Sequence, residues 1–192
     1  MRKYSVLALT AIFVSAFSFL VFSRVNSANE APKNNVVDKV MKLQAKQELD
    51  AAIKEASAAL SSDPNNVQLL ILSGQIYTNK GEFVLADKSL KKALNIAPKN
   101  VWGLRSLAAN YKAQYEKAKK NDPKDKNLAL AQATIEKALA ITPNDHWVNA
   151  EAAAIYLYQQ DKAKALKAIE VALKADPKQE YFKNLKKQID SM

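Results

Sequence analysis

Between residues 67 and 98, apolar and small residues recur at the spacing of two short amphipathic helices. One face of the first helix carries Leu70, Ser73, Gly74 and Tyr77, and one face of the second carries Ala86, Leu90, Ala93 and Leu94. Gly81 lies between them and permits a left-handed turn, whereas Pro98 ends the second helix. Because neither helix can bury its apolar face alone, the pair requires further copies of itself.

Such copies occur along most of the chain, and each one ends in a proline. The four prolines are Pro64, Pro98, Pro143 and Pro177, at separations of 34, 45 and 34 residues. Small residues recur where two helices must approach closely, namely at Gly74, Ala108 and Ala153 in the first helices and at Ala52, Ala86, Ala131 and Ala165 in the second helices. An aromatic residue also recurs, as Tyr77, Tyr111 and Tyr156.

This pattern resembles the tetratricopeptide repeat family from about Asn34 to Met192. The resemblance implies an all-α fold, a right-handed α-solenoid of about four helix hairpins. We place the repeats at 34–66, 67–100, 101–145 and 146–179, within a repeat domain of residues 34–192. Residues 180–190 are expected to form a capping helix that covers the last apolar face, with one N-terminal hydrophobic helix preceding the domain.

The third repeat is eleven residues longer than the second, and the extra residues lie between Tyr111 and Ala131. We expect both helices of this repeat to be lengthened by more than a turn, so that the hairpin protrudes. Asp125 or Asn127 is expected to cap its second helix. Lysines would decorate the tip as a solvated or a docking surface, namely Lys117, Lys119, Lys120, Lys124 and Lys126.

The N-terminus contains twenty consecutive uncharged residues, from Tyr4 to Ser23, after Arg2 and Lys3. A helix of this length spans about 30 Å, the thickness of a bilayer core. Residues 1–25 are therefore expected to be a transmembrane anchor or a signal peptide cleaved before about Ala28, followed by a linker over 26–33. The basic start favours the cytoplasmic side, so the repeats would lie outside the cytoplasm. That compartment would be the periplasm if the source is a Gram-negative bacterium.

The composition excludes several kinds of chemistry. The chain has no cysteine, which rules out disulfides, thiol nucleophiles and cysteine-bound metals. Its one histidine, His146, follows Asp145 at an expected helix start and cannot by itself form a metal cluster or a catalytic triad. No glycine-rich phosphate loop or nucleophile elbow is found. We therefore expect no enzymatic activity, metal or cofactor.

The resemblance implies a partner-binding groove along the first helices of the repeats. In the family, the second, fifth, ninth, twelfth and thirteenth places of each repeat face this groove. From these places we predict a partner-binding groove that includes Gln75, Asn79, Trp102, Arg105, Lys112, Trp147 and Tyr158. The two tryptophans either line the groove or fasten one repeat onto the preceding one. Such a groove suits an extended or helical peptide with apolar and acidic side chains.

Some members of the family bind a partner's terminal carboxylate with a clamp of lysine and asparagine residues, but this sequence lacks those residues at the corresponding places. The corresponding places here hold Val37, Met41, Ser106, Trp147 and Glu151.

Three functions fit the sequence. The leading one is a non-catalytic protein–protein interaction scaffold or adaptor on the far side of the membrane. The second is a basic protein that docks on anionic lipid or nucleic acid through its lysine-rich hairpin, since the chain has a formal net charge of +10. The third is a self-assembling structural subunit. We expect a protein or peptide partner and no nucleic acid, and the sequence leaves the oligomeric state open.

Overall fold

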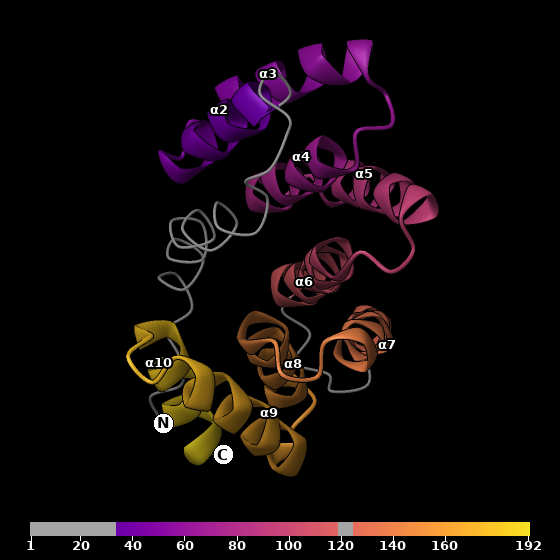
Figure 1. The fold of residues 1–192 in the computed structure, drawn as a ribbon. Coiled ribbons are helices and arrows are strands. Elements are labelled where there is room, and N and C mark those ends of the chain that lie inside the picture. Colours follow the sequence, from indigo (N-terminus) through magenta and orange to yellow (C-terminus); the bar gives the residue numbers. More distant parts are fainter. Residues whose placement is uncertain (1–33, 119–124) are drawn as a thin grey trace.

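The computed structural model describes residues 34–118 and 125–192, and within these ranges it contains nine α-helices and no strand (Figure 1). The helices are α2 Asn34–Ala45, α3 Leu49–Ser62, α4 Val67–Lys80, α5 Phe83–Ile96, α6 Val101–Ala118, α7 Lys126–Ile141, α8 His146–Tyr158, α9 Lys162–Ala175 and α10 Glu180–Asp190. The expected N-terminal hydrophobic helix and linker lie outside the described residues, as do Lys119, Lys120 and Lys124. Among the helices described, none is long and apolar enough to cross a membrane.

Each second helix ends two residues before its proline, for one stereochemical reason. The proline ring excludes helical geometry from the residue that precedes it. Accordingly, Asp63, Ala97, Thr142 and Asp176 have φ of −131°, −130°, −131° and −138°. Asn66, Asn100 and Asp145 then cap the next helix, because their side-chain oxygens accept a backbone N–H three residues ahead at 3.1, 2.8 and 2.8 Å.

The helices pack closely over small side chains. Ala52, Ala86, Ala131 and Ala165, at the same place in successive second helices, are all fully buried. A methyl group at Gly74 would overlap Cγ of Leu90 and lie 2.7 Å from its Cδ2. The prediction of a close approach at Gly74 is confirmed, and the side chain that lies nearest to it is Leu90, one turn beyond Ala86.

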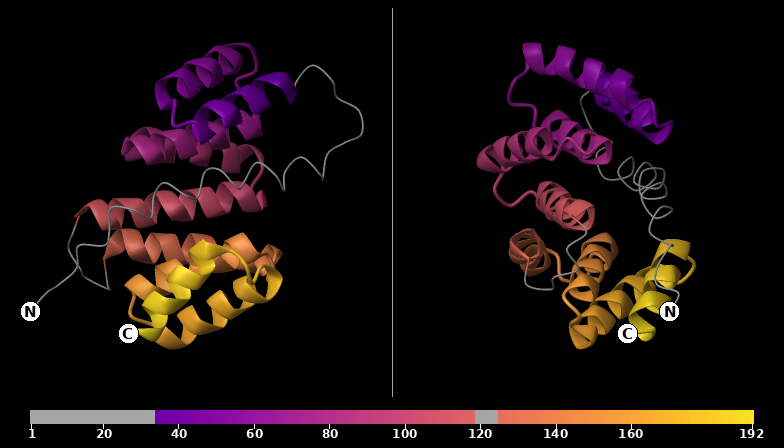
Figure 2. Two further views of the ribbon diagram at one scale, coloured as in Figure 1. Left: turned by 90° about the vertical axis from the view of Figure 1, so that its left-hand side faces the viewer. Right: turned by 180° about the vertical axis from the view of Figure 1, so that it is seen from behind.

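The stack is curved, and the first helices of the repeats lie on its inner side (Figures 1 and 2). Consecutive first helices α2, α4, α6, α8 and α10 contact one another, whereas the described second helices make no such contacts among themselves. Because the inner side of a curved stack is the shorter one, its helices are the ones brought together. Side chains from different repeats can therefore meet on this concave face.

The long third repeat agrees only in part with expectation. With 18 residues against the 14 of α4, α6 is longer by just over a turn, and its C-terminal end projects beyond its neighbours (left view of Figure 2). By contrast, α7 has 16 residues, only two more than α5, so the expected lengthening of both helices is wrong for this one. Asp125 caps α7 by accepting the backbone N–H of Asn127 at 2.8 Å. This cap fixes the start of α7.

We predict that Gly74→Ala destabilises the fold by about 1–3 kcal/mol, because the added methyl overlaps Leu90. The free energy of unfolding in urea measures this. In a Leu90→Ala background the methyl enters vacated space, so the same substitution should there be neutral or stabilising by up to about 1 kcal/mol through helix propensity. Equal destabilisation in both backgrounds would contradict the Gly74–Leu90 contact.

A second prediction concerns the turns inside the second and fourth repeats. Gly81 has a φ of 76°, and Gln160 at the corresponding turn of the fourth repeat has a φ of 60°. Left-handed geometry costs a residue with a Cβ about 1–2 kcal/mol, so Gly81→Ala should destabilise by this amount. Gln160→Gly should be neutral or stabilising by less than about 1 kcal/mol, because relief of strain is offset by glycine's freedom in the unfolded chain. Urea unfolding of both variants checks this; a neutral Gly81→Ala would contradict it.

Candidate functional site on the concave face

Two first helices, α6 and α8, each direct a stripe of side chains toward the concave face. On α6, Arg105 and Lys112 are seven residues apart, which is about two helical turns or 10–11 Å. On α8, Trp147, Glu151 and Tyr158 recur at intervals of four and seven residues. Because α6 contacts α8 and α8 contacts α10, these stripes lie side by side.

Arg105 lies over the ring of Trp147, which in turn stacks with an aromatic residue of the next first helix. Its guanidinium carbon lies 5.9 Å from the ring centre of Trp147. On α10, Tyr181 stacks with Trp147 at 6.5 Å and an interplanar angle of 21°. A planar cation over an indole face is attracted by the ring's negative face while its N–H groups stay available at the edge. This arrangement fixes Arg105 without using its hydrogen-bond donors.

None of the carboxylates in the described ranges lies within 4.0 Å of Arg105. Those nearest to it in electrostatic terms are Glu151 and Asp145. Asp145 already accepts the backbone N–H of Val148 at 2.8 Å as the cap of α8. Desolvation lowers the pKa of Arg105, yet arginine stays protonated in proteins. Arg105, a partly buried residue, is therefore a cation whose N–H groups can donate to an anionic ligand.

Lys112 and Glu151 form an ion pair across α6 and α8. The Nζ–Oε1 distance is 3.0 Å, and the two side chains are only 15% and 14% exposed. Burial opposes the charge of Lys112, but the surrounding acidic groups, with Glu151 first among them, together outweigh burial and raise the pKa of Lys112 well above its ordinary value. The same Oε1 accepts no hydrogen bond with good geometry, so charge attraction dominates this contact. Lys112 is thus neutralised within the protein.

Arg105, Lys112, Trp147, Glu151 and Tyr181 together are termed the inner cluster. Beside it, Tyr158 packs edge-on against Tyr115, with ring centres 5.4 Å apart. Burial, followed by the charge of Glu116, raises the pKa of Tyr158, so this phenol stays neutral and can donate a hydrogen bond. The structure places Arg105, Lys112, Trp147 and Tyr158 on one face of two adjoining helices.

The three other predicted site residues are arranged differently. Trp102 packs against both hydrophobic core clusters, the one around α2–α4 and the one around α4–α10. This contact corresponds to the alternative in which a tryptophan fastens one repeat onto another. Gln75 donates its amide to Ser106 Oγ at 2.8 Å, so that donor links α4 to α6. Asn79 lies exposed near the end of α4, one helix away from the α6–α8 pair.

Glu151 and Tyr181 are the members of the inner cluster that are not among the predicted site residues. In the sequence, Glu151 marks only a departure from a carboxylate clamp, and Tyr181 falls within the predicted capping helix. Tyr181 is 34 residues after Trp147, one repeat length, and this spacing could have identified it. The sequence holds no comparable signal for Glu151, because its partner depends on the tilt between α6 and α8.

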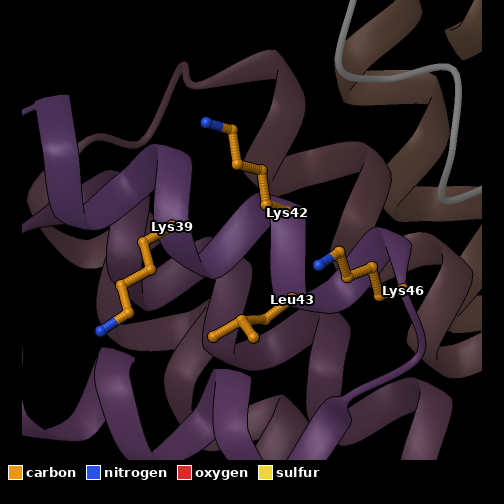
Figure 3. Close-up of a pocket in the computed structure, with 4 residues that line it drawn as sticks. All are labelled: Lys39, Lys42, Leu43 and Lys46. Atoms are coloured by element: carbon orange, nitrogen blue, oxygen red, sulfur yellow. The ribbon is translucent and has the colours of Figure 1, made fainter.

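A shallow pocket of about 280 Å³ lies elsewhere, along α2, and is lined by Lys39, Lys42, Leu43 and Lys46 (Figure 3). The three amines point in different directions, and Lys39 is paired with Glu55 at 2.7 Å. Such a surface is typical of a solvated helix face. Within the described residues, no three His, Asp or Glu side chains come together as a metal site would require.

Comparison with known proteins is consistent with this architecture. The family model of the tetratricopeptide repeat matches residues 67–100, which comprise α4 and α5. A comparison with curated protein sequences gives no match. Proteins built from such repeats generally act as non-catalytic scaffolds for protein–protein interaction.

Several solved structures share the fold. A thermophilic TPR protein of Thermus thermophilus superposes with a TM-score of 0.75 at 21% identity, over 83% of this chain and 82% of that chain. A double mutant of MamA RS-1 gives a TM-score of 0.61 at 16% identity, over 85% and 86%. Another MamA structure gives 0.56 at 20% identity, over 79% and 95%. Residues 67–100 therefore form a tetratricopeptide repeat, and the described chain has the helical-solenoid fold of proteins built from such repeats.

Proposed function

We propose that this protein is a non-catalytic adaptor that binds a peptide or protein segment on its concave face, with the inner cluster as the centre of the site. The observation that carries the proposal is Arg105, which stacks on Trp147 while no described carboxylate lies within 4.0 Å of it. Arginine and aromatic residues dominate the binding energy at protein interfaces. An acidic and partly apolar segment would complement this surface.

Its placement on the far side of a membrane is a further part of the proposal. The support is the uncharged run from Tyr4 to Ser23 and the basic residues before it. Anchoring would confine the adaptor to a membrane surface and raise its effective concentration near partners there. Export after signal cleavage before about Ala28 is the alternative.

Arg105→Gln should abolish partner binding with little loss of stability, because it removes the charge without placing a second carboxylate beside Glu151. A photo-crosslinker in place of Ala113, the neighbour of Lys112 on α6, measures the loss as disappearance of the crosslinked band, and circular dichroism checks the fold. The matched control is Lys126→Gln, an exposed residue at the start of α7. Loss of crosslinking in the control, with retention in Arg105→Gln, would move the site to the lysine-rich hairpin.

For the anchor, we expect the full-length protein to sediment with membranes and to resist extraction by high salt and carbonate. The reason is that an uncharged segment of twenty residues is long enough to span the bilayer core and is held there by its apolar surface. Membrane fractionation followed by N-terminal sequencing measures this. A mature N-terminus at Ala28 or Asn29 would contradict the retained anchor and favour export.

A further inference from the structure

We propose that Glu151 determines which partners the concave face accepts, by keeping Lys112 neutralised so that Arg105 is the one cation of the inner cluster open to a ligand. This inference rests on the proposed function and adds the chemistry of the partner. The expected ligand is a peptide segment with a single carboxylate side chain at Arg105 and apolar side chains beside it.

The charges around the cluster support this assignment. Glu151 lies 3.0 Å from Lys112, and both side chains are largely shielded from water. Asp145 is engaged at the N-terminus of α8, and Glu116 interacts with the Tyr158 hydroxyl. The nearby carboxylates therefore each have a partner within the protein, whereas the donors of Arg105 have none among the described carboxylates.

The geometry also sets where a second acidic side chain would fall. Arg105 and Lys112 are two turns apart on α6, or about 10–11 Å. In a peptide with polyproline II geometry, residues three positions apart lie on the same side and about 9 Å apart, which is close to that separation. A second carboxylate at that spacing would arrive at Lys112, where Glu151 already lies and repels it. A segment with two such carboxylates therefore gains nothing over a segment with one.

The test uses six-residue peptides of alanine and leucine with blocked ends, carrying no glutamate, one glutamate, or two glutamates three positions apart. The chain has only two tryptophans, so the indole N–H signals in an NMR spectrum resolve Trp147 from Trp102. In the native protein, one glutamate should shift the Trp147 signal, no glutamate should not, and the second glutamate should change the Kd by less than about twofold.

In Glu151→Gln, Lys112 loses its partner, and the second glutamate should tighten binding about tenfold, the usual value of a charge-assisted hydrogen bond. Lys112→Gln/Glu151→Gln provides a variant in which no unpaired lysine is left. This double variant should bind the one-glutamate and the two-glutamate peptides with the same Kd as the native protein. If Lys112 instead contacted the ligand directly, the double variant would bind more weakly than the native protein. This second variant decides the question even if Glu151→Gln fails to fold.

Two results would overturn the inference. One is a native protein that prefers the two-glutamate peptide as strongly as Glu151→Gln does, and the other is weakened binding in the double variant. The proposed function fails separately, if crosslinking from the concave face captures no partner or is unaffected by Arg105→Gln. If crosslinking to a partner depends on Arg105 but the second glutamate does not tighten binding to Glu151→Gln, then the role of Glu151 is refuted while the proposed function stands.

Discussion

The structure depends on the close approach of helices at glycine and alanine residues, which have the smallest side chains. Gly74 leaves room for Leu90 to lie directly on the backbone of α4, and fully buried alanines occupy the same place in every second helix. Packed interiors tolerate little change in volume, so these positions set both the distance and the tilt between helices. A repeat whose helices crossed at another angle would not match the next repeat.

The chemistry of the concave face follows from this packing. Because successive first helices touch, equivalent positions in neighbouring repeats become spatial neighbours. Trp147 and Tyr181 occupy equivalent places and stack, and Arg105 from the preceding repeat reaches the same indole. A cation over an indole ring that itself stacks on a tyrosine of the next helix is thus assembled by repetition. No single repeat contains these three residues.

Much of the fold could be predicted from the sequence, because its signals are local. Each proline restricts the residue before it, and α3, α5, α7 and α9 all end accordingly. The site could be predicted only in part. The resemblance to the repeat family predicted Arg105, Lys112, Trp147 and Tyr158 as groove residues, but the pairing of Lys112 with Glu151 depends on the angle between two helices. The two-residue extension of α7 likewise depends on where Asp125 caps it, which composition does not determine.

The most direct measurement of an open cation beside Trp147 is fluorescence quenching by ions of opposite charge. In a Trp102→Phe background the emission comes from Trp147 alone, because the chain has two tryptophans. Iodide should quench this emission more steeply than caesium, since Arg105 attracts anions to the indole and repels cations. The difference should largely disappear in Arg105→Gln. Equal quenching by iodide and caesium, or a difference that persists without Arg105, would contradict the assignment of Arg105 as the anion-binding centre of the concave face.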